Sequence, residues 1–263
     1  MPRFLPETLA EFRAIFSTRP VWMALAREDI GDQHRRTWLG PLWLLVNYLI
    51  FAGTFIYVFQ GAGAKAGNYT AYVCLGLLTW FYMTEAITLS VSLFVREESF
   101  IKGTKLPLTT YVMRLGMQSV IRSGYALAGC LAILWLNGVT PSPAWAWSGL
   151  GVLLILWVTP AAITVFAFLG AFFPDSQFIV ANLMRIGLFL TPVLWTPETA
   201  TGIRHLFYYW DPFTYFLEIV RVPILAGSVP IHAFVVCLVT GLALWLVALL
   251  LLGRYRRHIV FVI

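Results

Sequence analysis

Charged residues are scarce in this chain. Asp, Glu, Lys and Arg make up 11% of its 263 residues, whereas a typical soluble domain is about one-quarter charged. Hydrophobic residues make up 60%. The scarcity of charge excludes an ordinary soluble domain and indicates a chain whose surroundings are mostly lipid.

Residue patterns for metal binding, catalysis and nucleotide binding are also missing. Cys74, Cys130 and Cys237 are widely spaced within apolar stretches, so neither a disulfide framework nor a zinc site is expected. No Gly-Lys dipeptide occurs, so the phosphate-binding loop GxxxxGK[ST] is absent. If ATP drives this protein, another chain must bind it. The four histidines are scattered, without acidic neighbours at metal-ligand spacing: His34, His205, His232 and His258. We therefore expect no metal and no catalytic residues.

The apolar residues occur in long stretches. A helix needs about 20 mostly apolar residues to cross the hydrocarbon core of a membrane. Six stretches approach this length, at roughly 39–60, 70–94, 115–136, 145–172, 177–195 and 231–252. The sequence therefore predicts an all-α integral membrane protein with six transmembrane helices. The chain reads as a single transmembrane domain, 1–263, with interfacial or gate helices at 1–38, the six-span bundle at 39–252 and a tail at 253–263.

The positive charges predict the orientation of these spans. Thirteen of the eighteen Lys and Arg residues lie on the side of the termini, in residues 1–38, 96–114 and 254–257, and three lie on the other side. Lys and Arg are enriched in cytoplasmic loops, so both termini are predicted to be cytoplasmic. The net charge of +6 is explained by this topology, and we expect no nucleic-acid partner.

The first 38 residues predict helices that lie on the membrane rather than across it. In residues 20–43 an apolar half is followed by a charged half. One interpretation is an anchor helix followed by aromatic residues at the interface. The other is that Arg35, Arg36 and Trp38 contact an anionic lipid head group, since paired basic residues at that depth suit phosphate. An amphipathic stripe precedes this segment: Leu5, Leu9, Phe12 and Phe16.

Residues 196–230 are too polar to cross a membrane and too apolar for a free loop. Asp211 followed by Pro212 is typical of a helix start. The apolar stripe that follows leaves Arg221 off it, and Pro223 is expected to end or kink the helix. We predict two short re-entrant helices in the outer leaflet.

Two charges fall inside predicted spans. Glu85 lies about ten residues from the cytoplasmic end of the second span, and Arg122 about eight from that of the third. Charges within a membrane are normally paired or face water. We predict that Glu85 and Arg122 pair; the alternative is that each faces a hydrated path separately.

Several motifs resemble those of a known family. They are "RRTWLGPLW" (35–43), "FIKGTKLPL" (100–108), "LTPVLW" (190–195), "DPFTYFLEIVR" (211–221) and "RYRRH" (254–258). In this order and spacing, over nearly the whole chain, they are similar to the permease subunits of type-2 ABC exporters for capsular polysaccharide, O-antigen or teichoic acid. Gly103-Thr104 and Leu106-Pro107 stand where family members often carry a basic pair and an aromatic before the proline.

The resemblance implies a transport subunit of the bacterial cytoplasmic (inner) membrane that is not itself an enzyme. Its partners would be a second copy of this chain, two copies of a separate P-loop ATPase that binds ATP and Mg, membrane lipids and a lipid-linked polysaccharide. The implied ATPase-coupling helix comprises Glu97, Glu98, Ser99, Phe100, Ile101 and Lys102. The implied channel lining, at the dimer interface, includes Tyr48, Phe51, Phe55, Phe189 and Trp195.

Other functions fit the residues less well. An exporter of a drug or small lipid is the main alternative within the ABC class. A membrane-bound lipid-linked transferase would need convergent acids, bases or metal ligands. An ion-driven transporter commonly shows repeated halves and several intramembrane carboxylates, and here only Glu85 is deep. The composition of a glycan, its lipid carrier and any carbohydrate-binding extension of the ATPase are not encoded in these patterns.

Overall fold

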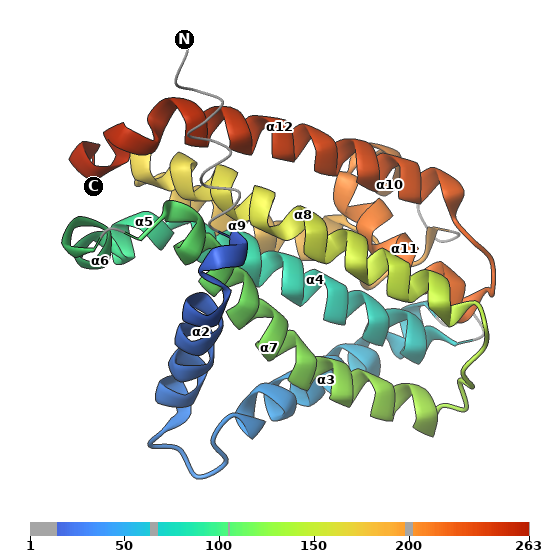
Figure 1. Ribbon diagram of the computed structural model, residues 1–263. Helices are drawn as coiled ribbons and strands as arrows, with labels where there is room; N and C mark the ends of the chain where they lie inside the picture. Colours follow the sequence, from blue (N-terminus) through green and yellow to red (C-terminus); the bar gives the residue numbers. More distant parts are fainter. Residues whose placement is uncertain (1–14, 64–67, 105, 198–201, 263) are drawn as a thin grey trace.

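The computed structural model describes residues 15–63, 68–104, 106–197 and 202–262. Within them the regular elements are helices and no strand occurs, as predicted. The long helices run side by side in one elongated bundle (Figure 1). The helices are α2 Arg19–His34, α3 Leu42–Gly63, α4 Tyr69–Val91, α5 Leu93–Arg96, α6 Glu98–Gly103, α7 Leu108–Leu136, α8 Trp145–Phe172, α9 Ser176–Leu190, α10 Ile203–Trp210, α11 Pro212–Leu225 and α12 Ile231–Val262.

Five helices of the described chain are long and apolar enough to cross a membrane: α3, α4, α7, α8 and α12. They coincide with five of the six predicted stretches, and α8 has the predicted limits, 145–172. Its sequence explains this agreement, because Pro143 precedes the helix and Pro174 follows it, and proline disfavours continuation of a helix.

The remaining predicted span, 177–195, is only partly helical. α9 has 15 residues and is therefore about 22 Å long, shorter than a hydrocarbon core of about 30 Å. It ends because Thr191 precedes Pro192, which disfavours helical backbone, and Thr191 is extended (φ −71°, ψ 145°). Asp175 occupies the N-cap of α9, but its side chain makes no capping hydrogen bond there.

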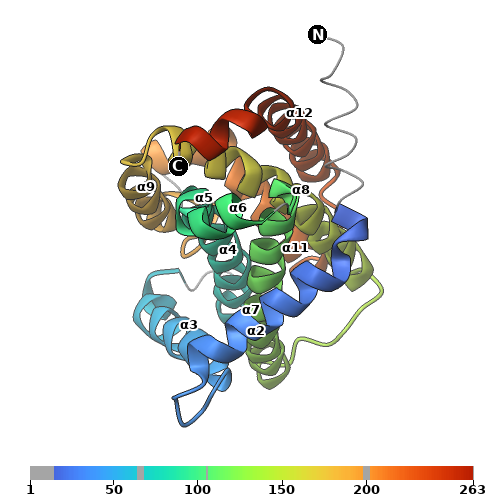
Figure 2. The ribbon, with the colours of Figure 1, turned by 60° about the vertical axis from the view of Figure 1, so that its left-hand side comes forward.

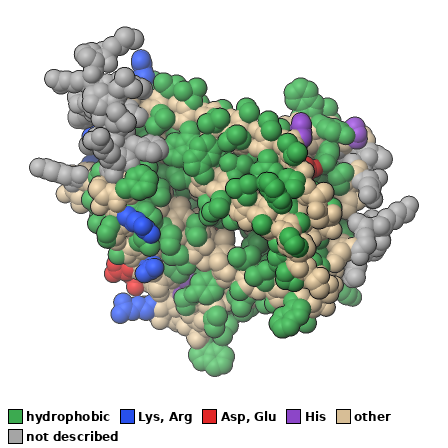
Figure 3. Space-filling view, turned by 45° about the vertical axis from the view of Figure 1, so that its right-hand side comes forward, with side chains coloured by type: hydrophobic (Ala, Val, Ile, Leu, Met, Phe, Trp, Pro, Cys, Tyr) green, Lys and Arg blue, Asp and Glu red, His purple; other side chains and the backbone are tan. Residues whose placement is uncertain are grey.

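The core of the bundle surrounds α4. Of the residues in the apolar segment of α4, 67% are buried, compared with 11% in the apolar segment of α3. α8 packs closely against α4: a Cβ on Gly170 would lie 1.7 Å from the carbonyl oxygen of Val91. Hydrophobic side chains cover most of the face in Figure 3, while most of its charged side chains gather at one end. An apolar surface with most of its charge at one end suits a protein surrounded by lipid.

Two helices are longer than predicted. α7 begins at Leu108, seven residues before the predicted start at 115. α12 continues to Val262, through most of the predicted tail at 253–263. Ile259 gives the reason, since it is fully buried in one cluster with Ile101 of α6. Of the predicted N-terminal stripe, Leu5, Leu9 and Phe12 lie outside the described residues, and Phe16 is exposed.

Residues 202–225 contain two short helices, α10 and α11, which agrees with the predicted number of short helices in this region. The Asp211 carboxylate accepts a 3.0 Å hydrogen bond from the backbone N–H of Phe213, and Pro212 is the first helical residue. Pro223 lies inside α11, which ends two residues later. Arg221 corrects the prediction, because it is only 3% exposed instead of lying off the buried stripe.

Candidate functional site

The predicted coupling segment forms a separate short helix, α6, between α5 and α7 (Figure 2). Its side chains divide into two groups. Phe100 is 54% exposed and Ser99 and Lys102 are also exposed, whereas Ile101 is buried in one hydrophobic cluster with Phe94 and Tyr111. Lys102 Nζ lies 2.7 Å from Glu98 Oε1, an ion pair within the helix. α6 is therefore anchored by one apolar residue and presents the others outward.

Glu97 is the buried charged residue of the predicted coupling set. It is the N-cap residue of α6 and is buried. Its carboxylate faces inward, with Oε2 2.9 Å from Arg114 Nη1 and Oε1 3.6 Å from Arg96 Nε. In this structure the Glu97 carboxylate is therefore occupied by internal contacts.

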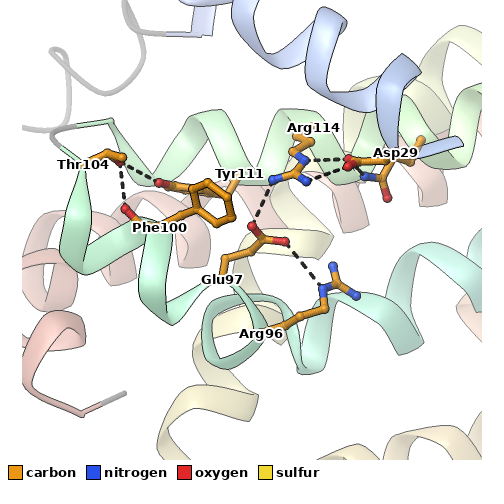
Figure 4. A network of polar contacts seen from close by, with 8 residues as sticks. Asp29, Arg96, Glu97, Phe100, Thr104, Tyr111 and Arg114 are labelled. Atoms are coloured by element: carbon orange, nitrogen blue, oxygen red, sulfur yellow. Dashed lines mark hydrogen bonds and ion pairs between the residues drawn. The ribbon is translucent and has the colours of Figure 1, made fainter. Parts of the chain in front are cut away.

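Arg114 of α7 joins two parts of the chain (Figure 4). Besides Glu97, it donates two hydrogen bonds to the Asp29 carboxylate of α2, of 2.6 Å from Nε and 2.7 Å from Nη2. Gln118 also donates to Asp29. The sequence analysis missed this network, because 85 residues separate Asp29 from Arg114 and no short-range pattern relates them.

The predicted pair of intramembrane charges is formed. Arg122 Nη1 lies 2.6 Å from Glu85 Oε1, and Ser119 donates to the same oxygen at 3.3 Å. Arg122 Nη2 also donates to Gln33 Oε1 of α2 at 2.9 Å. The pair borders a cavity of about 240 Å³ between α3, α4 and α7, lined by Leu44, Asn47, Tyr48, Phe51, Leu78, Phe81, Tyr82, Glu85, Arg122, Ser123 and Ala126.

The residues predicted to contact lipid head groups lie in the turn between α2 and α3. Trp38 is 99% exposed, and Arg35 and Arg36 are exposed as well. Arg35 Nη1 lies 3.7 Å from Asp32 Oδ1, a solvent-exposed pair, and such pairs contribute little to stability. The turn therefore offers two guanidinium groups and an indole ring at one place on the surface.

The predicted channel-lining aromatics fall into two sets. Phe51 and Phe189 are exposed and Phe55 is half-buried. Tyr48 and Trp195 are buried instead: the Tyr48 hydroxyl donates to the Cys74 carbonyl at 2.8 Å, and Trp195 Nε1 donates to the Phe189 carbonyl at 3.0 Å. Their hydroxyl and indole groups are held by the protein's own backbone, although Tyr48 also borders the cavity beside Glu85 and Arg122.

The non-helical stretch after α9, residues 191–197, is held by side chains. Arg221 of α11 donates to the carbonyls of Pro192 and Val193, at 2.5 and 3.0 Å. Tyr72 donates to the Pro192 and Trp195 carbonyls, at 3.0 and 3.1 Å. The guanidinium carbon of Arg221 also lies 3.9 Å from the centre of the Tyr72 ring. These side chains supply hydrogen-bond partners that the non-helical backbone does not provide for itself.

Asp211 supports the same stretch from its other side. It accepts a 2.6 Å hydrogen bond from the Thr191 hydroxyl, at the point where α9 ends. Burial raises the pKa of the Asp211 carboxyl, while the hydrogen bonds from Thr191 and the Phe213 N–H act in the opposite direction. Asp211 therefore caps α11 and fixes the end of α9 together.

Metal ligands do not gather anywhere in the described ranges, where no group of three His, Cys, Asp or Glu side chains could hold an ion. All three cysteines are buried free thiols. What the structure brings together is thus a short exposed helix, the charge network behind it and an exposed basic turn.

Comparison with known proteins gives similarity over most of the chain. Two O-antigen export system permease proteins (RfbA) of Klebsiella pneumoniae are similar to it: one is 22% identical over 237 residues, 89% of this chain and 91% of the relative, and the other 25% identical over 179 residues, 67% and 69%. A protein of the same name from Myxococcus xanthus is 21% identical over 188 residues, 71% of this chain and 72% of the relative. The sequence profile of the family described as ABC-2 type transporter matches residues 20–225. With that match over most of its length, the chain belongs to the ABC-2 type transporter family.

Proposed function

We propose that this chain is the transmembrane subunit of an ATP-driven exporter of a lipid-linked polysaccharide. It works as a homodimer with two copies of a separate P-loop ATPase, which binds ATP and Mg. The similarity to O-antigen export permeases over 89% of the chain is the main support. The chain itself contributes no catalytic residue in this proposal, because the ATPase supplies hydrolysis and this chain supplies the path.

α6 is the proposed docking element for the ATPase. Phe100 and Lys102 are exposed on it while Ile101 anchors it. A partly exposed aromatic beside charged residues is typical of a protein-binding surface, since aromatic residues carry much of the binding energy at interfaces.

The proposed location is the bacterial cytoplasmic (inner) membrane, with six crossings and cytoplasmic termini. α9 and the irregular stretch after it together make the fifth crossing, and α10 and α11 dip into the outer leaflet. The side-chain hydrogen bonds to residues 192–195 support this proposal, because non-helical backbone is tolerated at membrane depth only where it is buried in protein or lines a water-filled cavity. The bias of Lys and Arg supports the orientation.

Two substrate contacts are part of the proposal. Arg35, Arg36 and Trp38 receive the anionic head group of the lipid carrier, since guanidinium groups suit phosphate. Phe51, Phe55 and Phe189 line the path of the glycan, because aromatic rings offer flat faces on which sugar rings can stack. Tyr48 and Trp195 support these helices from within rather than contacting substrate.

Deletion of the gene tests the substrate class. We expect polymer to accumulate in the cytoplasm and surface glycan to be lost, with both reversed by the wild-type gene. Unchanged surface glycan with altered drug tolerance would favour a small-molecule exporter instead. A cysteine placed at Lys102 tests the orientation: a membrane-impermeant thiol reagent should label it in inverted vesicles and leave it unlabelled in intact cells.

A further inference from the structure

α2 is attached to α7 through two arginines of α7. Arg114 binds Asp29, and Arg122 binds Gln33. Asp29 and Gln33 are four residues apart and so lie one turn apart on the same face of α2. Near the start of α2, the hydroxyls of Thr18 and Thr110 are 3.2 Å apart. Polar contacts therefore hold α2 along the first half of α7.

Each of these arginines also holds an acidic residue on the other side. Arg114 pairs with Glu97, immediately before α6, and Arg122 pairs with Glu85 of α4. α7 thus lies between α2 and the segment from α4 to α6, and it contacts both of them through Arg114 and through Arg122. Of these two arginines, only Arg114 has a partner next to the exposed short helix α6.

Arg114 belongs to a row of ion pairs in which positive and negative side chains alternate, Arg96–Glu97–Arg114–Asp29. The side chains of Glu97, Arg114 and Asp29 are 10, 15 and 22% exposed, whereas the Lys102–Glu98 pair is 42 and 47% exposed. Partly shielded, doubly bonded pairs of this kind are more strongly coupled than exposed pairs. α6 is itself firmly seated on α7, because Thr104 and Tyr111 share a 3.1 Å hydrogen bond and Ile101 is buried.

We infer that Arg114 is a positioning residue that couples α6 to α2, so that a displacement of the short helix is passed to the basic turn with Arg35 and Arg36. That the displacement comes from an ATPase rests on the proposed function; the coupling itself does not. Glu97 and Asp29 hold opposite sides of one guanidinium (Figure 4), so neither acid can move without changing the position of the group that holds the other. Contact of Arg35 and Arg36 with a lipid head group, which also rests on the proposed function, would thereby be regulated from the docking helix.

Hydrogen exchange of the purified chain in lipid nanodiscs tests the coupling. Backbone exchange is measured in α2 and in residues 93–103 for Asp29→Asn, Glu97→Gln and the double variant, each with Arg114 intact and with Arg114→Gln. Asp29 has no contact with α6, and Glu97 has none with α2, among the hydrogen bonds and ion pairs of the described residues. Arg27→Gln, an exposed position on α2, is the matched control for charge loss.

With Arg114 intact, each single substitution should change exchange in the other helix by about threefold or more, because residues of one ion-pair network are energetically coupled. In the Arg114→Gln background these remote effects should vanish, and the control should show none. Arg114→Lys keeps the charge but cannot make the forked contacts, so it should reduce the remote effects without abolishing the fold. Effects confined to the substituted helix, or remote effects that persist without Arg114, would overturn the inference.

Addition of a co-purifying ATPase with a non-hydrolysable nucleotide extends the test. Exchange in α2 should then change in the wild-type chain and not in Arg114→Gln, whereas a purely structural role of Arg114 would leave the nucleotide response in place. Failure of any ATPase to co-purify would count against the proposed function, while the results on the isolated chain still decide the role of Arg114.

Discussion

Replacing Arg221 tests whether a buried guanidinium holds the end of α9. Arg221 is 3% exposed and donates to the carbonyls of Pro192 and Val193. Its Nε has no hydrogen-bond partner within the described residues. Arg221→Met keeps most of the side-chain length and removes every donor. The Val193 carbonyl then loses this partner, while Pro192 keeps the Tyr72 hydroxyl.

The size of the effect follows from these contacts. Each hydrogen bond to a charged group contributes about 1.5–3 kcal/mol, and the guanidinium over the Tyr72 ring adds about 1–2 kcal/mol. Removing a buried charge relieves part of its desolvation cost, which offsets some of this loss. We therefore expect a net destabilisation of about 2–4 kcal/mol. For a chain of this size, that lowers the melting temperature by roughly 5–15 °C.

The buried cysteines supply the assay. Cys74, Cys130 and Cys237 are each 0% exposed, so a fluorogenic maleimide reports their exposure as the detergent-purified protein is heated. Arg185→Met is the control, because Arg185 is exposed on α9 and forms no ion pair within the described part of the chain. Equal melting temperatures for Arg221→Met and the control would refute the assigned role of Arg221.

Gly76 provides an independent check on the same contact. A Cβ there would lie 1.4 Å from Arg221 Nη2, so Gly76→Ala must displace the guanidinium. Gly76→Ala should therefore lower the melting temperature of the wild-type protein and have little effect in an Arg221→Ala background, where the space is free. Additive effects of the two substitutions would show that they act at separate places.

Three further sets of substitutions test the packing, the charge pair and the docking helix. Gly170→Ala should destabilise the protein by about 1–3 kcal/mol, because the new Cβ meets the backbone of Val91; an unchanged melting temperature would contradict this close approach. Glu85→Gln and Arg122→Gln should each reduce export, and exchanging the two charges should restore part of it; an exchange no better than the single variants would argue against the pair. Phe100→Ala should reduce ATPase co-purification about tenfold or more without changing the melting temperature, and equal recovery would exclude Phe100 from the docking surface.

Local sequence signals predicted the elements whose ends depend on nearby residues. Asp211 and Pro212 begin α11 as predicted because a carboxylate cap and a fixed proline φ act within one turn. The Glu85–Arg122 pair followed from helix depth alone, since an unpaired charge in lipid is costly. The signal for the early end of α9 was present in Pro192, but the apolar composition of 177–195 outweighed it in the count of spans.

Tertiary contacts decided the features that the sequence did not predict. The start of α7 at Leu108 lies in a polar stretch that resembles a loop, and its Arg114 finds partners only when α2 and Glu97 come together. Arg221 was placed off the apolar stripe because helical periodicity ignores a partner from another segment, here the carbonyls after α9. Burial of Glu97 was missed for the same reason.

The length of α12 means that a single helix connects the region near Ile231 with the region near Ile259. Its 32 residues correspond to about 48 Å of helix, against roughly 30 Å of hydrocarbon core. Several turns must therefore project beyond the lipid as part of one continuous helix, and Ile259 on those turns is buried in the same hydrophobic cluster as Ile101. Any tilt of α12 thus displaces the surface around the short helix, and the other end of α12, near Ile231, moves with it.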